Sequence, residues 1–155
     1  MSTICYLLSD TARLLRREFD ARVRQLGVTG PQARLILLLE TSEGENQGFY
    51  AERLEVEAIS LGRMLDRMAD AGLVERRTDP GDRRAWRIHL TAPSRAVIGR
   101  LRVCIEALEA AMLAGLSQSE RADSAVLLAK MRANLGNNAS AVAVHPAALR
   151  SAAHG

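Results

Sequence analysis

The sequence is poor in aromatic residues. Only five of its 155 residues are Phe, Trp or Tyr, whereas Ala, Leu and Arg together account for 67. Strands favour aromatic and β-branched residues, while Ala, Leu and Arg are strong helix formers. The composition therefore excludes an all-β fold and predicts a mainly helical one, and the length fits a single globular domain.

Cysteines and long apolar runs are also scarce. The only two cysteines, Cys5 and Cys104, lie far apart, and neither CxxC nor HExxH occurs, so we expect no metal site and no cofactor. The longest uncharged run, 133–149, contains Pro146 and is shorter than the roughly 20 apolar residues of a membrane helix. The apolar stretch stopped by Asp10 follows no basic segment, unlike a secretory signal. We therefore expect a cytoplasmic protein with no membrane partner.

Catalytic motifs are missing as well. The three histidines, His89, His145 and His154, are scattered, and the sequence has no nucleophile motif and no glycine-rich phosphate loop. We therefore expect that the chain is not an enzyme. Arginine, in contrast, is abundant, and the net charge of +3 permits an anionic partner without requiring one.

Apolar periodicity predicts six helices and one hairpin. Apolar residues recur at helical spacing in six segments: 3–26, 29–42, 46–54, 56–71, 91–114 and 117–136. Signals at helix ends support these boundaries, and they are Gly27, Thr29, Gly72, Thr91 and the capping box of Ser117 and Glu120. Between Gly72 and Thr91, two alternating stretches, 73–77 and 85–90, flank a turn at Pro80-Gly81 and predict a β-hairpin. Its second strand is expected to point Trp86, Ile88 and Leu90 to one side.

Helices followed by a hairpin form the plan of a winged helix-turn-helix. The predicted fold is mainly α with a small β-hairpin wing, in a single domain, 1–136, whose winged core covers about 30–91. The flanking helices, 1–27 and 92–136, have surplus apolar seams that a two-fold homodimer would bury. The Ala-rich tail, 137–155, is predicted to be a low-complexity segment that is mobile or packs as an accessory arm.

The hairpin carries a more specific pattern. Residues 72–84 read GLVERRTDPGDRR, residues 87–91 read RIHLT, and residues 60–67 read SLGRMLDR. With these motifs the chain resembles the MarR family of bacterial transcription regulators from Cys5 to about Leu135. The resemblance implies a homodimer that binds inverted-repeat double-stranded DNA through the winged core and usually represses. It also implies that a small, commonly aromatic or phenolic, effector often releases the DNA.

The helix over 56–71 supplies the first candidate DNA contacts. Ser60, Arg63 and Arg67 lie on a side away from its apolar residues and could face a major groove. Arg63 is the candidate for a bidentate contact with guanine, and Arg67 the candidate for a phosphate contact. Alternatively, Asp66 and Asp70 pair with these arginines on an ordinary solvated face.

The hairpin supplies the second set. Five arginines and two aspartates between Arg76 and Arg87 give it a local charge of +3. By resemblance, Arg84 enters a minor groove and Asp82 holds its guanidinium through a bidentate pair, with Arg83 beside them. In the alternative interpretation Asp82 stabilises the turn, and Arg83 or Arg84 is only solvated.

Two departures from the family pattern and one partial match leave other possibilities open. Gly62 stands where Ser or Thr is common, which loosens the reading helix. Ala33 stands where a large aromatic is usual, so either a neighbour fills the gap or a ligand cavity lies near the first two helices. Cys5 matches the position of a peroxide-sensing cysteine in one branch of the family, although the tyrosines of that branch are missing. Thiol-based sensing through Cys5, or a winged helix that binds a protein, are the alternative functions.

Overall fold

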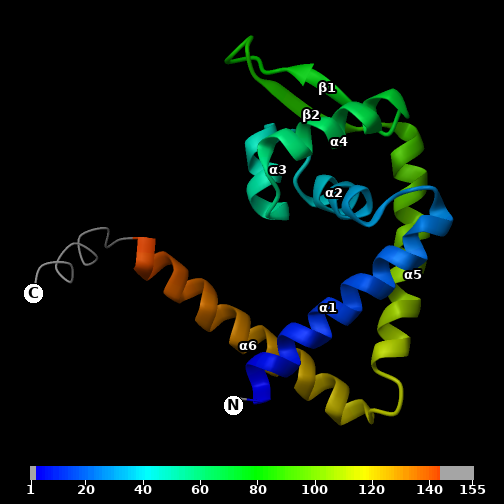
Figure 1. Cartoon of the computed structure of the whole chain (residues 1–155), viewed down its shortest axis with the longest axis vertical. Coiled ribbons are helices and arrows are strands. Elements are labelled where there is room, and N and C mark those ends of the chain that lie inside the picture. The colour runs from blue at the N-terminus through cyan, green and yellow to red at the C-terminus, as the bar shows by residue number, and fades with distance from the viewer. Residues whose placement is uncertain (1–2, 144–155) are drawn as a thin grey trace, which may run out of the picture. The chain divides into compact units, whose positions relative to one another are not determined.

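The computed structural model describes residues 3–143, and the side chains of residues 3–136. Its elements, in chain order, are α1 (Thr3–Val23), the 3₁₀ helix η1 (Arg24–Leu26), α2 (Gly30–Thr41), α3 (Gln47–Leu54), α4 (Ala58–Asp70), β1 (Val74–Thr78), β2 (Trp86–Leu90), α5 (Ala92–Met112) and α6 (Gln118–Ala143) (Figure 1). The chain divides into two compact units after Met112. The predicted fold class, mainly α with one β-hairpin, is confirmed.

The predicted helix ends rest on local hydrogen bonds. Thr29 caps α2 because its Oγ1 accepts from the Gln32 N–H at 3.3 Å, while its own N–H donates to Gln32 Oε1 at 2.9 Å. Gly27, at φ +81°, adopts the left-handed conformation that ends η1. Thr91 precedes α5, and its N–H donates to Ser94 Oγ at 3.0 Å. Short-range side-chain chemistry therefore sets the boundaries that the sequence predicts.

One apolar core joins all the elements of the first unit. The fully buried large side chains come from α1, α2, α3, α4, β2 and α5, and they include Val23, Leu35, Ile36, Leu39, Tyr50, Leu61, Leu65, Met68, Ile88 and Leu101. Leu61, Leu65 and Met68 belong to the face of α4 that periodicity assigns to the interior. The core therefore fixes which side of α4 points outward.

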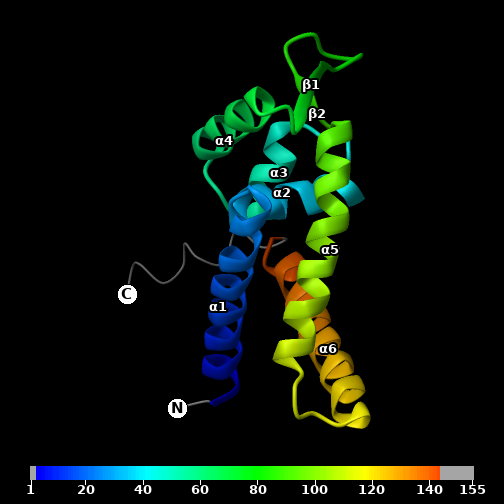
Figure 2. The same ribbon diagram turned by 90° about the vertical axis from the view of Figure 1, so that its right-hand side faces the viewer.

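The hairpin projects beyond α3 and α4 (Figure 2). Its strands pair antiparallel, from Val74 opposite Leu90 to Thr78 opposite Trp86. Ile88 and Leu90 are buried, whereas Trp86, which lies on the same side of the strand by alternation, is 49% exposed. Trp86 is the first residue of β2 and directly follows the connecting loop, whereas the buried residues Ile88 and Leu90 lie farther from that loop.

The second unit contains α6. The predicted capping box is confirmed, because the Ser117 N–H donates to Glu120 Oε2 at 2.8 Å and the Glu120 N–H donates to Ser117 Oγ at 3.3 Å. The helix continues to Ala143, so its predicted end near Gly136 is wrong. Gly136 is helical rather than left-handed and does not stop the helix. Residues 137–143 are thus helical, and residues 144–155 of the predicted tail lie outside the described residues.

Across the described part of the chain, each helix is too short or too polar to cross a membrane. Within the same residues, no three His, Cys, Asp or Glu side chains come together as a metal site requires. Cys5 is exposed near the start of α1, and Cys104 is partly buried on α5.

Candidate nucleic-acid interface

The outward face of α4 carries the predicted contact residues. Ser60, Arg63 and Arg67 are all exposed. The opposite face is anchored in the core by four buried side chains, Leu61, Met64, Leu65 and Met68. Because this anchoring fixes the rotation of α4 about its axis, the polar residues remain on the surface and are open to a partner.

A contact from α3 holds the first turn of α4. Gln47 Nε2 donates to the Ala58 carbonyl oxygen at 3.1 Å. A Cβ added at Gly62 would lie 3.2 Å from the same nitrogen, so the glycine leaves room for this amide. From the sequence, Gly62 is expected to loosen the helix, and the structure shows in addition a tertiary contact that makes use of the missing side chain.

The arginines of α4 are not neutralised by their own helix. Asp66 Oδ1 lies 2.7 Å from a terminal nitrogen of Arg76 on β1, so Asp66 pairs across to the hairpin instead. Among residues 3–136, neither Arg63 nor Arg67 takes part in an ion pair. The alternative in which Asp66 neutralises these arginines is therefore wrong, and both charges are available to a ligand.

The structure divides the five arginines of the hairpin region into two groups. Three are paired, as Arg76–Asp66, Arg77–Glu75 and Arg87–Asp79. Arg83 and Arg84, in the loop between the strands, are exposed and have no ion-pair partner in the part of the chain that the structure describes. The free positive charge of the hairpin is therefore concentrated at its tip.

Two aspartates shape that tip. Asp79 Oδ1 accepts from the Gly81 N–H at 2.7 Å, and its Oδ2 accepts from Arg87 Nε at 2.7 Å. The Gly81 hydrogen bond and the Arg87 pair lower the pKa of the Asp79 carboxyl. Asp82 Oδ1 accepts from the backbone N–H of Arg84 at 2.9 Å, which replaces the predicted pair with the Arg84 guanidinium. A spacing of two residues favours this side-chain-to-backbone turn, so Asp82 positions the Arg84 backbone.

The base of the hairpin is fixed by the loop between α2 and α3. The Gly44 N–H donates to the Ile88 carbonyl at 2.9 Å, and the Ile88 N–H donates to the Glu45 carbonyl at 3.1 Å. Arg87 also donates to the Gly44 carbonyl, at 3.0 Å. Residues 43–45 lie between the predicted helices 29–42 and 46–54, and no alternating pattern there predicts this pairing.

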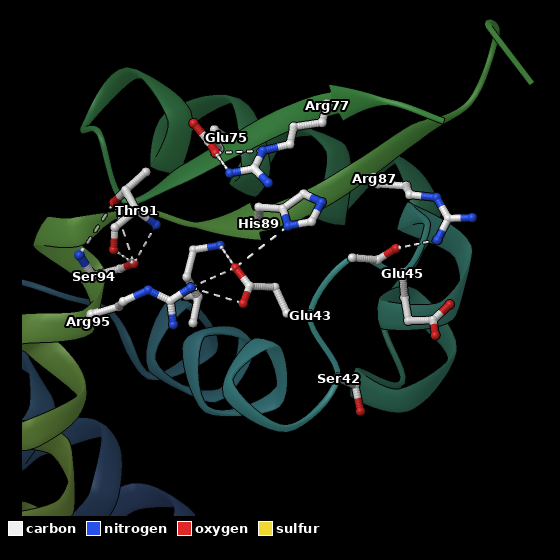
Figure 3. Close-up of polar contacts among 12 residues, drawn as sticks. Ser42, Glu43, Glu45, Glu75, Arg77, Arg87, His89, Thr91, Ser94 and Arg95 are labelled. Carbon is white, nitrogen blue, oxygen red and sulfur yellow. Dashed lines mark hydrogen bonds and ion pairs between the residues drawn. The ribbon is translucent and has the colours of Figure 1, made fainter. Parts of the chain in front are cut away.

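Glu43 connects this loop to both β2 and α5 (Figure 3). Its Oε1 accepts from the Leu90 N–H at 2.8 Å, and both carboxylate oxygens accept from Arg95 at 3.0 Å. His89 Nδ1 lies 3.6 Å away. Partial burial alone would raise the pKa of Glu43, but the Leu90 hydrogen bond and Arg95 outweigh it, and the pKa is lowered. Glu43 is thus an ionised link between three elements.

A groove of about 530 Å³ lies between α1, α2 and α5. Apolar side chains form most of its lining, which includes Leu15, Phe19, Leu37, Ile105, Leu108 and Met112, with Arg16, Arg34 and Glu109 among the polar members. Ala33 is fully buried in the core and does not line this groove. Of the two possibilities that Ala33 leaves open, its neighbours fill the space around it, and the groove near the first two helices is lined by other residues.

Comparisons with known proteins agree with this geometry. The sequence model of the MarR family matches residues 28–86. A MarR-family transcriptional regulator from Silicibacter pomeroyi is 30% identical, with a TM-score of 0.70, over 85% of this chain and 89% of that one. The transcriptional repressor CouR, solved bound to a 23-mer DNA duplex, is 26% identical, with a TM-score of 0.71, over 82% and 90%.

A third similar structure is Rv2887, a MarR-family protein from Mycobacterium tuberculosis in complex with salicylic acid. It is 27% identical, with a TM-score of 0.72, over 84% of this chain and 97% of that one. The match extends well beyond the winged core in all three structures. The chain therefore belongs to the MarR family and is a DNA-binding transcriptional regulator, not an enzyme.

Proposed function

We propose that the protein is a repressor that binds a pseudo-palindromic operator as a homodimer and responds to a small aromatic effector. The observation that carries the operator contacts is the pair of unneutralised arginine sites, one on α4 and one at the hairpin tip. A related chain, CouR, is a repressor solved with duplex DNA. In this proposal α4 enters a major groove and the hairpin enters the adjacent minor groove.

On α4, Arg63 is the proposed base-reading residue. It lies one helical turn before Arg67 on the exposed face, and a guanidinium can donate to guanine O6 and N7 together. Such a bidentate pair contributes about 1 to 3 kcal/mol of discrimination against another base. Arg67 then contacts phosphate and Ser60 supports the register, since phosphate contacts position a protein without reading sequence.

At the hairpin tip, Arg84 is the proposed minor-groove residue. A narrow minor groove has an enhanced negative potential that attracts an inserted arginine. Asp82 supports this contact by holding the Arg84 backbone, and its carboxylate does not neutralise the guanidinium. Arg83 also has no ion-pair partner among the described residues, and its proposed role is a phosphate contact.

The proposal of a homodimer rests on apolar side chains that are exposed in the single chain. On α1 they are Ile4, Tyr6, Leu7 and Leu8, and on α6 they are Val126, Leu127, Leu128 and Leu135. Burying such side chains against a second copy removes apolar surface from water. Two reading helices about one DNA turn apart, roughly 34 Å, then require an inverted repeat.

The proposed effector site is the groove between α1, α2 and α5. Its size and apolar lining suit an aromatic ring, and Arg16 offers a charge for an acidic substituent. Arg34 is already paired with Asp20 at 2.8 Å, which leaves Arg16 as the better candidate of the two. The related protein Rv2887 was solved with salicylic acid, an aromatic acid of this kind.

The decisive experiment selects sheared genomic DNA on the purified protein at about 150 mM salt, near physiological ionic strength. Arg84→Ala and Arg77→Ala are run in parallel, because each removes one positive charge from the hairpin but only Arg84 is unpaired. We expect wild type and Arg77→Ala to retain fragments sharing an inverted repeat and Arg84→Ala to lose them. Equal, unenriched retention by all three proteins contradicts the proposal and favours a winged helix that binds a protein.

A further inference from the structure

Ile59 has no evident structural role. It is 71% exposed, more than any other large apolar side chain among the described residues. It lies in the first turn of α4 and opposite the buried face of that helix. Isoleucine is a weaker helix former than alanine, so its presence there does not stabilise the isolated helix. Exposure alone proves nothing, since single apolar residues are common on protein surfaces.

Ile59 lies next to Arg63 on the exposed face of α4, and this position suggests a role for its exposed side chain. The two residues are four apart, and helical neighbours at that spacing lie about 5 to 6 Å apart on the same face. Arg63 is unpaired and outward-facing. An apolar side chain therefore lies beside the proposed base-reading arginine. It is nearer the N-terminus of α4, the helix proposed to enter the major groove of DNA.

The first turn of α4 is also held in place. Gln47 from α3 donates to the carbonyl of Ala58, the residue directly before Ile59. Buried Leu61 follows two residues later. The backbone that carries Ile59 is thus fixed from both sides, as a side chain that reads a base requires.

We propose that Ile59 is a specificity residue that packs against the C5 methyl group of a thymine in the major groove. Among the four bases of DNA, only thymine presents an apolar group there, and apolar side chains recognise it by contact. Base pairs are about 3.4 Å apart along the helix axis, so a separation of 5 to 6 Å places this thymine one or two steps from the base read by Arg63. The inference rests on the proposed function of α4.

The test uses an operator duplex selected from a random library by the full-length protein. Each thymine of the half-site is replaced in turn by deoxyuridine, which lacks only the methyl group, and affinity is measured by fluorescence anisotropy. We expect one position at which the replacement weakens wild-type binding roughly fourfold, the equivalent of one buried methyl group. Ile59→Ala should bind both duplexes equally, and Ile59→Val, which keeps two methyl groups, should retain most of the difference.

One control variant and two further outcomes separate the possible results. Arg67→Ala should weaken binding to both duplexes alike and keep the preference for thymine, because it alters a phosphate contact. If deoxyuridine weakens wild type at no position, or weakens Ile59→Ala to the same extent, the inference about Ile59 is overturned while DNA binding stands. If the library yields no enriched duplex, the proposed function fails and the inference fails with it.

Discussion

Neighbouring arginines of this protein differ in whether they have an ion-pair partner. Arg77 and Arg84 both lie in the hairpin region and both are exposed, but Arg77 contacts Glu75 while Arg84 has no ion-pair partner within the described residues. A composition count treats the two as equal. The structure separates them, because the charge of Arg77 is already offset by Glu75 and that of Arg84 is not.

The first prediction concerns this pair. We expect Arg84→Ala to lower operator affinity at least roughly tenfold, because it removes the unneutralised charge that we propose for the minor-groove contact. Arg77→Ala should lower it less, since its charge is already offset by Glu75. Fluorescence anisotropy at fixed salt measures both, and equal losses would show that only net charge matters.

Gly62 allows a second prediction at the same scale. Gly62→Ala gains about 1 kcal/mol of helix propensity, but the new Cβ lies 3.2 Å from Gln47 Nε2 and disturbs its bond to Ala58. We expect less than the full gain in the wild-type background and about 1 kcal/mol in a Gln47→Ala background. Urea unfolding of the four proteins tests this, and identical gains in both backgrounds would mean that the Gln47 contact contributes nothing.

At the scale of elements, Glu43 ties the α2–α3 loop to β2 and α5. Its pKa is lower in the folded protein than its ordinary value of 4.5. A lowered pKa means that the ionised carboxylate stabilises the fold above the unfolded value, and that this stabilisation is lost as the pH falls through the folded value. The anchoring of the hairpin should therefore weaken in acid.

This gives a third prediction. Glu43→Gln should destabilise the protein by about 1 to 2 kcal/mol at neutral pH, because it weakens charge-assisted hydrogen bonds from Leu90 and Arg95. Below the ordinary glutamate value of 4.5 the difference from wild type should shrink. Thermal unfolding over this pH range measures it, and a difference that is constant with pH would contradict the assignment.

Some elements of the fold could be predicted from the sequence, and some contacts between elements could not. The helices, the hairpin and the buried face of α4 follow from periodicity and end signals, because those depend on residues close in the chain. The pairing of Gly44 and Glu45 with Ile88 depends on residues more than 40 positions apart, and no local pattern encodes it. The exposed Trp86 and the continuation of α6 past Gly136 were missed for a related reason, since an alternating pattern or a glycine does not show where packing ends.

The candidate site divides in the same way. Its residue types and their exposed face could be predicted from spacing on one helix and from one hairpin motif. The partners of these residues could not be predicted. Asp66 pairs with Arg76 and not with an arginine of its own helix, and Asp82 accepts a hydrogen bond from the Arg84 backbone and not from its side chain. Such choices depend on tertiary geometry. Ile59 was missed because a lone apolar residue on a polar face gives no signal until its exposure is known.

At the scale of the whole molecule, the fourth prediction concerns assembly. The wild-type protein should sediment at twice the 16.9 kDa of one chain, because α1 and α6 leave apolar side chains exposed. Leu127→Glu should weaken the dimer and also lower operator affinity, since it places a charge among Val126 and Leu128. Far-UV circular dichroism checks that α6 remains helical, and a wild-type monomer that binds its operator tightly would contradict the homodimer.

Helix α5 connects the root of the hairpin with the groove between α1, α2 and α5. Thr91 Oγ1 donates to the Gly72 carbonyl at 2.6 Å, which pins the start of α5 to the root of the hairpin. The 21 residues of α5 then extend about 31 Å, and Ile105, Leu108 and Met112 near its far end line the groove. A ligand bound there would push on the far end of α5. Because the helix is stiff, the resulting tilt would be transmitted to the hairpin. A tilt of about 5° corresponds to a displacement of about 3 Å over that length, close to one base-pair step.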